Sequence, residues 1–180
     1  VLCDKGFNDV EILKSFNLSG SKMGMHLDSN KVVGVDASTG SLGHGLSIAL
    51  GTALAAKVLG KDYKTFCILG DGECDEGSNW EAAMAAAHYK LGNLIWIIDR
   101  NKLEIDGPTE QVLGLEPLHE KVAAFGFDVI ECQGNDMADV DRALAEAWAN
   151  NSGRPTCIIS HTIKGIGVEN HLSDGIMTLM

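Results

Sequence analysis

Four short apolar runs recur along the second two thirds of the chain. They are rich in β-branched and aromatic residues, which favour strands. The run at residues 94–99 is continuous rather than alternating, which is typical of a strand buried on both faces. The pattern predicts strands at residues 65–69, 94–99, 127–132 and 156–160.

Helical patterns precede and separate these runs. An Ala-rich stretch follows the first run, with Ser78 placed as its N-cap. The predicted helices cover residues 10–16, 42–59, 80–89, 117–125 and 137–150. Strands that alternate with helices form βαβ units. We therefore expect an α/β fold with a mainly parallel sheet and helices on both faces.

Polar residues and glycines follow each predicted strand. Ligands of open parallel sheets bind beyond the carboxyl ends of the strands. Asp71 and Asn101 are expected to project from neighbouring strand ends. A carboxylate, an amide oxygen and a nearby main-chain carbonyl make a hard oxygen site suited to Mg²⁺ or Ca²⁺. Gly70 and Gly72 would leave a phosphate room to approach the backbone closely.

The same residues have a purely structural interpretation, because Asp-Gly pairs and Asn are frequent in turns. The metal hypothesis therefore depends on their shared position after buried strands. Other nucleotide motifs fit less well. GSLGHG at residues 40–45 lacks GxGxxG spacing and precedes the first strand, and no GxxxxGK[ST] occurs.

Charge and composition narrow the classes of partner. A formal net charge of -11 argues against a nucleic-acid backbone. No apolar run approaches the roughly 20 residues that span a bilayer, so no membrane association is expected. With 180 residues, one domain is expected. The five cysteines form no CxxC pair, and Cys67, Cys132 and Cys157 lie in apolar runs, so we expect a reducing, cytoplasmic compartment.

Four segments, in order, resemble the thiamine-diphosphate-binding portion of transketolases. GDGECDEGSNWEAAMAAAHYKLGNLIWIIDRN looks like the motif that begins with GDG and ends with Asn about 30 residues later. Upstream, STGSLGHGLS is similar to STGSLGQGLS, and SKMGMHLDSNKVVGVD resembles the stretch with a GHP histidine. Downstream, HTIKGIGV is similar to TxKGxGV. The sequence looks most like the N-terminal subunit of a bacterial split transketolase.

The resemblance implies roles for particular residues. Asp71, Asn101 and the carbonyl of Leu103 would bind the metal, and Gly72 would lie against the diphosphate. The backbone of Gly40 and Leu42 would lie near the aminopyrimidine.

Further residues match functional positions of the family, although some of their neighbours differ from the family's motifs. Glu76 and Glu81 correspond to acidic residues at a subunit interface. His26 matches the GHP histidine near diphosphate and substrate, although Met25 and Leu27 replace its neighbours. Near the end of the chain, Lys164 is expected to lie near a phosphate group. His171 is the candidate for a second catalytic histidine.

The implied function is two-carbon ketol transfer between sugar phosphates, with thiamine diphosphate and Mg²⁺ (or Ca²⁺) as cofactors. A pyrimidine-binding partner would complete the site in a homo- or hetero-oligomer. Residues 1–180 would form one diphosphate-binding domain, without the N-terminal helices that carry an LSKGH-like motif and without a pyrimidine-binding domain. The missing LSKGH-like motif and a tail, VENHLSDGIMTLM, without the family's WHG segment leave a non-catalytic truncated binding domain as an alternative. Another thiamine-diphosphate enzyme, a deoxyxylulose-phosphate synthase or a 2-oxoacid dehydrogenase E1 component, is a separate alternative.

Overall fold

A four-stranded parallel sheet forms the centre of the protein. The computed structural model describes residues 1–166. Its sheet has the strand order β1-β2-β6-β5, and a short antiparallel hairpin pairs β3 with β4. The elements, in chain order, are the 3₁₀ helix η1 (Val10–Ser15), α1 (Gly45–Val58), β1 (Thr65–Gly70), the 3₁₀ helix η2 (Gly72–Asp75), α2 (Gly77–His88), β2 (Leu94–Arg100), β3 (Leu103–Glu104), β4 (Gly107–Pro108), α3 (Thr109–Val112), α4 (Leu118–Ala124), β5 (Asp128–Gln133), α5 (Met137–Ala149) and β6 (Thr156–His161).

The four predicted strands are all present and all parallel. Strand β2 lies between β1 and β6, and five of its seven residues are buried. This burial agrees with the continuous apolar run in its sequence. Each strand extends one residue beyond the predicted carboxyl end.

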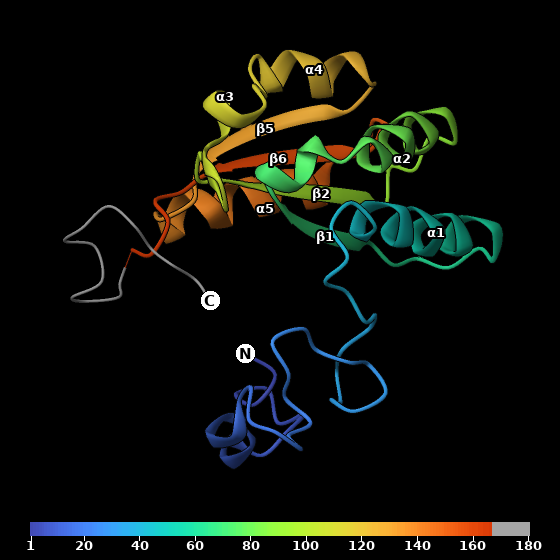
Figure 1. The fold of residues 1–180 in the computed structure, drawn as a ribbon. Helices are drawn as coiled ribbons and strands as arrows, with labels where there is room; N and C mark the ends of the chain where they lie inside the picture. The colour runs from blue at the N-terminus through green and yellow to red at the C-terminus, as the bar shows by residue number, and fades with distance from the viewer. Residues whose placement is uncertain (167–180) are drawn as a thin grey trace.

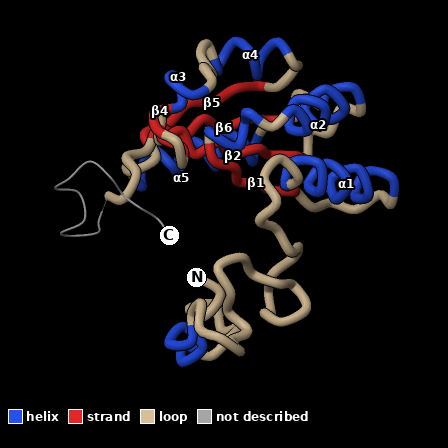
Figure 2. Tube along the Cα trace, in the orientation of Figure 1, coloured by secondary structure: helices blue, strands red, loops and turns tan. Residues whose placement is uncertain are grey.

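Helices cover both faces of the sheet, as predicted (Figures 1 and 2). One apolar cluster joins α1, α2 and α4 to one face of β1, β2 and β6. A second cluster joins α5 to the opposite face of β2, β5 and β6. The carboxyl ends of the strands meet at one edge of the sheet, where the β3–β4 hairpin and α3 also lie (Figure 1).

The core contains large aromatic side chains around β2 and small side chains on the buried faces of α1 and α2. Trp96 of β2 is fully buried and packs edge-on against Trp80 and Phe127. Helices α1 and α2 instead bury small residues such as Ala53 and Ala83, which lets each helix pack closely. Four of the five cysteines are buried, among them Cys67, Cys132 and Cys157 of the apolar runs, and none of the five forms a disulfide within the described residues.

The helix predicted at residues 10–16 is present as a 3₁₀ helix over Val10–Ser15, with Asp9 as its N-cap and no buried residue. One local expectation is wrong. Ser78 does not cap α2, which begins one residue earlier at Gly77. The Ser78 hydroxyl donates instead to the Gly43 carbonyl at 2.7 Å, because a tertiary acceptor lies within its reach.

The N-terminal residues that precede α1 are mostly loop and lie beneath the sheet (Figure 2). Within residues 1–166, no helix has both the length and the apolar character needed to cross a bilayer.

We predict that Ala83→Leu lowers the free energy of unfolding by about 1–3 kcal/mol, because a larger side chain overpacks the closed space beneath α2. Urea unfolding measures this change. Met84→Leu, at the next, exposed position, is the matched control and should stay within about 0.5 kcal/mol of the parent chain. Equal effects of the two substitutions would contradict the packing of α2 described above.

Candidate functional site

Asp71 lies at the carboxyl end of β1, beside the end of β2. The register pairs Gly70 with Asp99, and the Asp71 amide donates to the Asp99 carbonyl at 3.1 Å. The Asp71 side chain is fully buried. Its Oδ1 accepts the Gly72 amide at 2.9 Å, and its Oδ2 accepts the Lys102 amide at 2.6 Å. The structure therefore brings Asp71 against the turn that contains Asn101, as the sequence predicts.

Asn101 and Leu103 form this turn. The Asn101 Oδ1 accepts the Leu103 amide at 3.0 Å, and its Nδ2 donates to the Asp99 carboxylate at 3.2 Å. Lys102, between them, has a φ of 65°, a left-handed conformation. Leu103 then starts the β3–β4 hairpin, which the sequence analysis missed although Asp106-Gly107 is a hairpin signal.

The two glycines beside Asp71 differ in what surrounds them. A Cβ on Gly70 would meet nothing within 4 Å, so the backbone there is open. A Cβ on Gly72 would lie 2.7 Å from the Glu104 Cβ, so Gly72 allows the hairpin to pack against η2.

Negative charge gathers around Asp71. Buried oxygens of Asp75 and Glu104 have no hydrogen-bond partner within the described chain. Burial raises the pKa of Asp75, and the negative charge of Asp71 adds to the increase. Burial also raises the pKa of Glu104, with further contributions from Asp75, Asp106 and Asp71. Carboxylates held in this way favour a nearby cation.

Arg100, which is not among the site residues predicted from the sequence, supplies the compensating positive charge. It is the last residue of β2 and its side chain is 1% exposed. Its guanidinium donates to Asp71 at 2.8 Å, Thr109 at 2.7 Å, Glu110 at 2.9 Å and Glu116 at 2.9 Å. The sequence does contain a signal for this role. Arg100 directly precedes Asn101 and ends an apolar run, and a charged residue at the end of a buried strand needs a partner of opposite charge.

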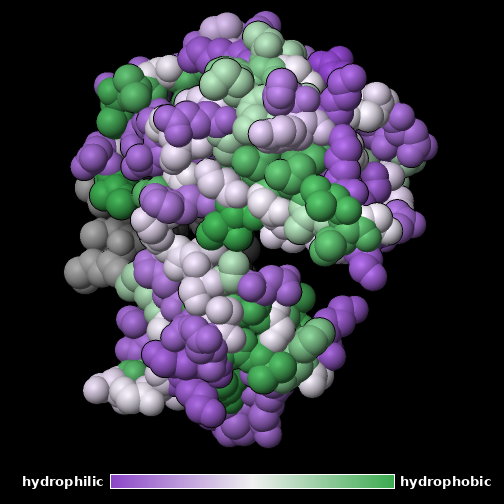
Figure 3. All heavy atoms as spheres, turned by 90° about the vertical axis from the view of Figure 1, so that its right-hand side faces the viewer, coloured by the Kyte–Doolittle hydropathy of each residue, from purple (hydrophilic) through white to green (hydrophobic). Residues whose placement is uncertain are grey.

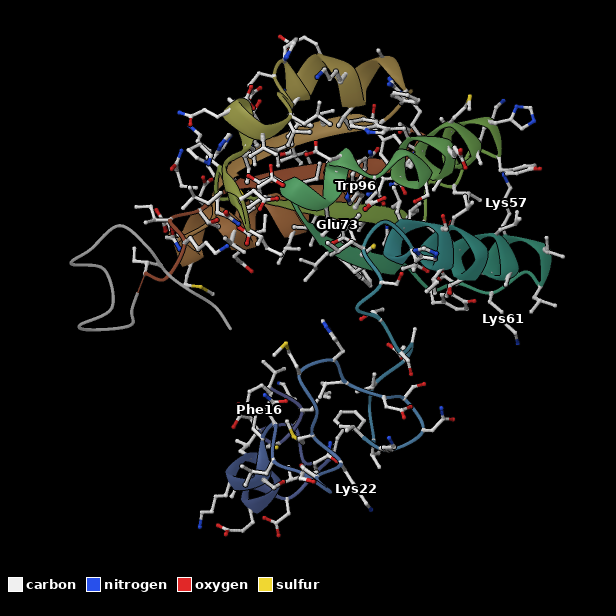
Figure 4. All side chains as sticks on the ribbon, viewed as in Figure 1. Phe16, Lys22, Lys57, Lys61, Glu73 and Trp96 are labelled. Carbon is white, nitrogen blue, oxygen red and sulfur yellow. The ribbon has the colours of Figure 1, made fainter. Side chains whose placement is uncertain are left out.

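A second group of predicted residues lines a cavity of about 990 Å³. His26, Gly40 and Leu42 lie in its wall, together with residues of α1, β1 and η2. The surface is hollowed between the N-terminal segment and the body of the protein (Figure 3). Glu73 of η2 also lines the cavity, and its Oε1 accepts the Gly43 amide at 3.0 Å (Figure 4). The cavity therefore reaches the carboxyl end of β1 at Leu69, and Glu73, two residues after Asp71, also lies in its wall.

His26 packs directly on Gly40. Gly40 has a φ of 124°, and a Cβ there would lie 2.5 Å from the Cγ of the His26 ring. Only glycine satisfies both the backbone conformation and this contact. Two segments singled out separately from the sequence thus meet in the structure.

The remaining predicted residues are more dispersed. Glu76, the residue before α2, and Glu81 on its surface are exposed. Lys164 is half-buried in the turn that follows β6. His171 lies outside the described residues. A further cluster, also missed, joins Glu131 to His119 at 2.7 Å and to His161 at 2.8 Å, at the same end of the sheet.

We predict that Gly40→Ala destabilises the chain by about 1–3 kcal/mol, because the new Cβ is strained and meets the His26 ring. His26→Ala in the same chain should restore the part due to the collision, which gives a coupling energy of about 0.5 kcal/mol or more. Urea unfolding of the two single variants and the double variant measures it. Gly77→Ala, where a Cβ meets nothing within 4 Å, is the control. Strictly additive effects would contradict the contact.

The sequence and the fold of this chain are both similar to those of known proteins. The family described as "Transketolase, thiamine diphosphate binding domain" matches residues 2–175. An apulose-4-phosphate transketolase subunit of Phocaeicola vulgatus is 46% identical over 164 residues, which are 91% of this chain and 58% of that protein. The subunit of the same name from Actinobacillus succinogenes is 46% identical over 167 residues, 93% of this chain and 60% of that protein.

A solved structure, "Transketolase from Leishmania mexicana", superposes with a TM-score of 0.79 at 36% identity, covering 84% of this chain and 24% of that one. This chain spans less than two thirds of the length of the two curated relatives. The match to the family covers nearly all of the 180 residues and includes every predicted site residue. The chain belongs to the transketolase family, and its matched residues are the family's thiamine diphosphate binding domain.

Proposed function

We propose that this chain anchors the diphosphate of thiamine diphosphate through a divalent cation, as one part of a two-carbon ketol transferase. One observation carries the proposal: a fully buried carboxylate, Asp71, is fixed at the carboxyl end of β1 against the turn formed by Asn101 and Leu103. Ligands of open parallel sheets bind at this end.

The cation would be Mg²⁺ or Ca²⁺. Its protein donors would be one carboxylate oxygen of Asp71, the amide oxygen of Asn101 and the carbonyl of Leu103, all hard oxygen ligands. The unpartnered buried oxygens of Asp75 and Glu104 support a positive charge in this region. The chain itself is strongly acidic, and a cation would offset the repulsion between the protein and a diphosphate.

Other residues would hold the cofactor in place. Gly70 and Gly72 would lie along the diphosphate. Gly70 borders open space, whereas the side chain of Glu104 packs against Gly72. Gly40 and Leu42 would lie near the aminopyrimidine, in the wall of the large cavity. Lys164 would offset phosphate charge.

The acidic and histidine positions would act at the borders of the site. Glu76, which precedes α2, and Glu81 of α2 would lie at a subunit interface and link paired cofactor sites. His26, fixed on Gly40, would face substrate. His171 remains a catalytic candidate that lies outside the described residues.

Thiamine diphosphate, when bound, supplies the carbanion-stabilising chemistry that ketol transfer requires. The residues of this chain bind, orient and exclude water. A partner would supply the pyrimidine-binding part, because the curated relatives are named as subunits. Sugar phosphates are the proposed substrates, in line with the apulose 4-phosphate in the names of those relatives.

We predict that the full chain binds thiamine diphosphate in calorimetric titration with Mg²⁺ and does not bind it after removal of divalent ions. Asp71→Asn should weaken binding more than about 100-fold, because even outer-shell substitutions cost about 10–100-fold in metal affinity. Asn101→Ala tests the second ligand while leaving the Arg100–Asp71 pair intact. Asp62→Asn, at an exposed position, is the matched control. Metal-independent binding would contradict the proposed anchor.

We also predict that the full chain, assembled with a pyrimidine-binding partner, forms glyceraldehyde phosphate from xylulose phosphate and ribose phosphate. A coupled assay for glyceraldehyde phosphate measures this product, and Asp71→Asn should abolish it. An assembled complex that binds cofactor yet forms no product with any ketose phosphate would overturn the catalytic part of the proposal. That outcome would leave a binding domain without turnover.

A further inference from the structure

Arg100 is saturated by its partners. Its guanidinium has five N–H groups. Nη1 donates to Asp71 and Thr109, Nη2 donates to Glu110 and Glu116, and Nε donates to Glu116 at 3.3 Å. Each N–H therefore has an acceptor. A planar fork held at five points has little freedom, so the direction from which it meets Asp71 is fixed.

The consequence for Asp71 is an asymmetry between its two oxygens. A carboxylate has about four lone-pair positions, two on each oxygen. Oδ2 accepts from both Arg100 and the Lys102 amide, at 2.8 and 2.6 Å, so both of its positions are filled. Oδ1 accepts from the Gly72 amide at 2.9 Å and keeps one position open. Of the two oxygens, Oδ1 is the one left to meet a cation.

This asymmetry distinguishes the two candidate cations. Mg²⁺ requires near-ideal octahedral geometry and is bound by few carboxylate oxygens, whereas Ca²⁺ takes six to eight oxygens and accepts carboxylates in mono- or bidentate form. A carboxylate restricted to one oxygen suits the smaller ion. Without Arg100, one position on Oδ2 would open and the carboxylate could offer both oxygens.

We propose that Arg100 is a positioning residue that selects the metal: by occupying Oδ2 it restricts Asp71 to Oδ1 and favours Mg²⁺ over Ca²⁺. This inference rests on the proposed cofactor anchor and goes beyond it, since it assigns a role to a residue that does not itself bind the ion. The guanidinium charge alone does not explain the preference, because a fixed positive charge repels both divalent cations.

The test is the ratio of the affinities for the two ions. Calorimetric titration of MgCl₂ and of CaCl₂ into the full chain with thiamine diphosphate gives both dissociation constants. Arg100→Met should lower the Mg²⁺-to-Ca²⁺ affinity ratio about 10-fold, at the lower end of outer-shell effects on metal sites. Ca²⁺ binding should be kept or strengthened, because an oxygen is freed and a positive charge is lost.

Arg100→Lys tests whether the effect comes from the positive charge or from the geometry of the guanidinium. It also provides a second variant if Arg100→Met does not fold. It keeps the positive charge but not the planar fork, so it should shift the ratio in the same direction, by less. Arg154→Met is the matched control. Arg154 is half-exposed, bonds the carbonyls of Gly126 and Phe127, and should leave the ratio unchanged.

The affinity ratios of the variants distinguish a role of Arg100 in metal selection from a purely structural role. If Arg100→Lys keeps the parent ratio, or if both variants weaken the two ions equally, Arg100 is only structural and the inference fails. If the parent chain binds the cofactor with neither ion, the proposed anchor fails and the inference fails with it. A ratio shifted in both Arg100 variants and unchanged in Arg154→Met supports the inference.

Discussion

The parallel pairing of β1 with β2 is the constraint on which the candidate site depends. Its register sets Gly70 opposite Asp99, so β2 ends only one residue beyond β1 and the turns after the two strands meet. Strand β2 is buried on both faces, and a shift by one residue would turn its side chains to the opposite faces. The position of Asp71 relative to Asn101 is therefore fixed by the apolar core, far from any ligand.

Several carboxylates are buried or partly buried at this edge of the sheet, and neighbouring hydrogen-bond donors compensate the negative charge of only some of them. An uncompensated buried carboxylate costs several kcal/mol, and two main-chain amides with Arg100 offset this cost at Asp71. Burial works to lower the pKa of Arg100, but its bonds to Asp71 and Glu116 outweigh that effect and leave the pKa raised. Asp75 and Glu104 remain with unpartnered oxygens. The sheet edge thus combines one rigid carboxylate with residual negative charge.

The loop before α1 ties the N-terminal segment to the same edge. The Gly43 amide donates to Glu73, its carbonyl accepts from Ser78, and a Cβ on Gly43 would lie 2.6 Å from the Glu76 Cβ. These bonds hold the loop against η2 and the start of α2. The contact of His26 with Gly40 then places the histidine in the wall of the cavity. The hydrogen bonds of Gly43 therefore hold the loop that carries Gly40 and Leu42 against η2, which begins one residue after Asp71.

The sequence by itself determined the four strands, most of the helices and the residues at the strand ends, because hydrophobic periodicity and turn residues are local signals. It also identified the family, through motifs that keep their order along the chain. The tertiary structure alone decided the partners of Arg100, the contact of His26 with Gly40 and the acceptor of Ser78. The Arg100–Asp71, His26–Gly40 and Ser78–Gly43 contacts join residues 29, 14 and 35 positions apart. Their formation depends on how the sheet brings distant turns together, which no local pattern records.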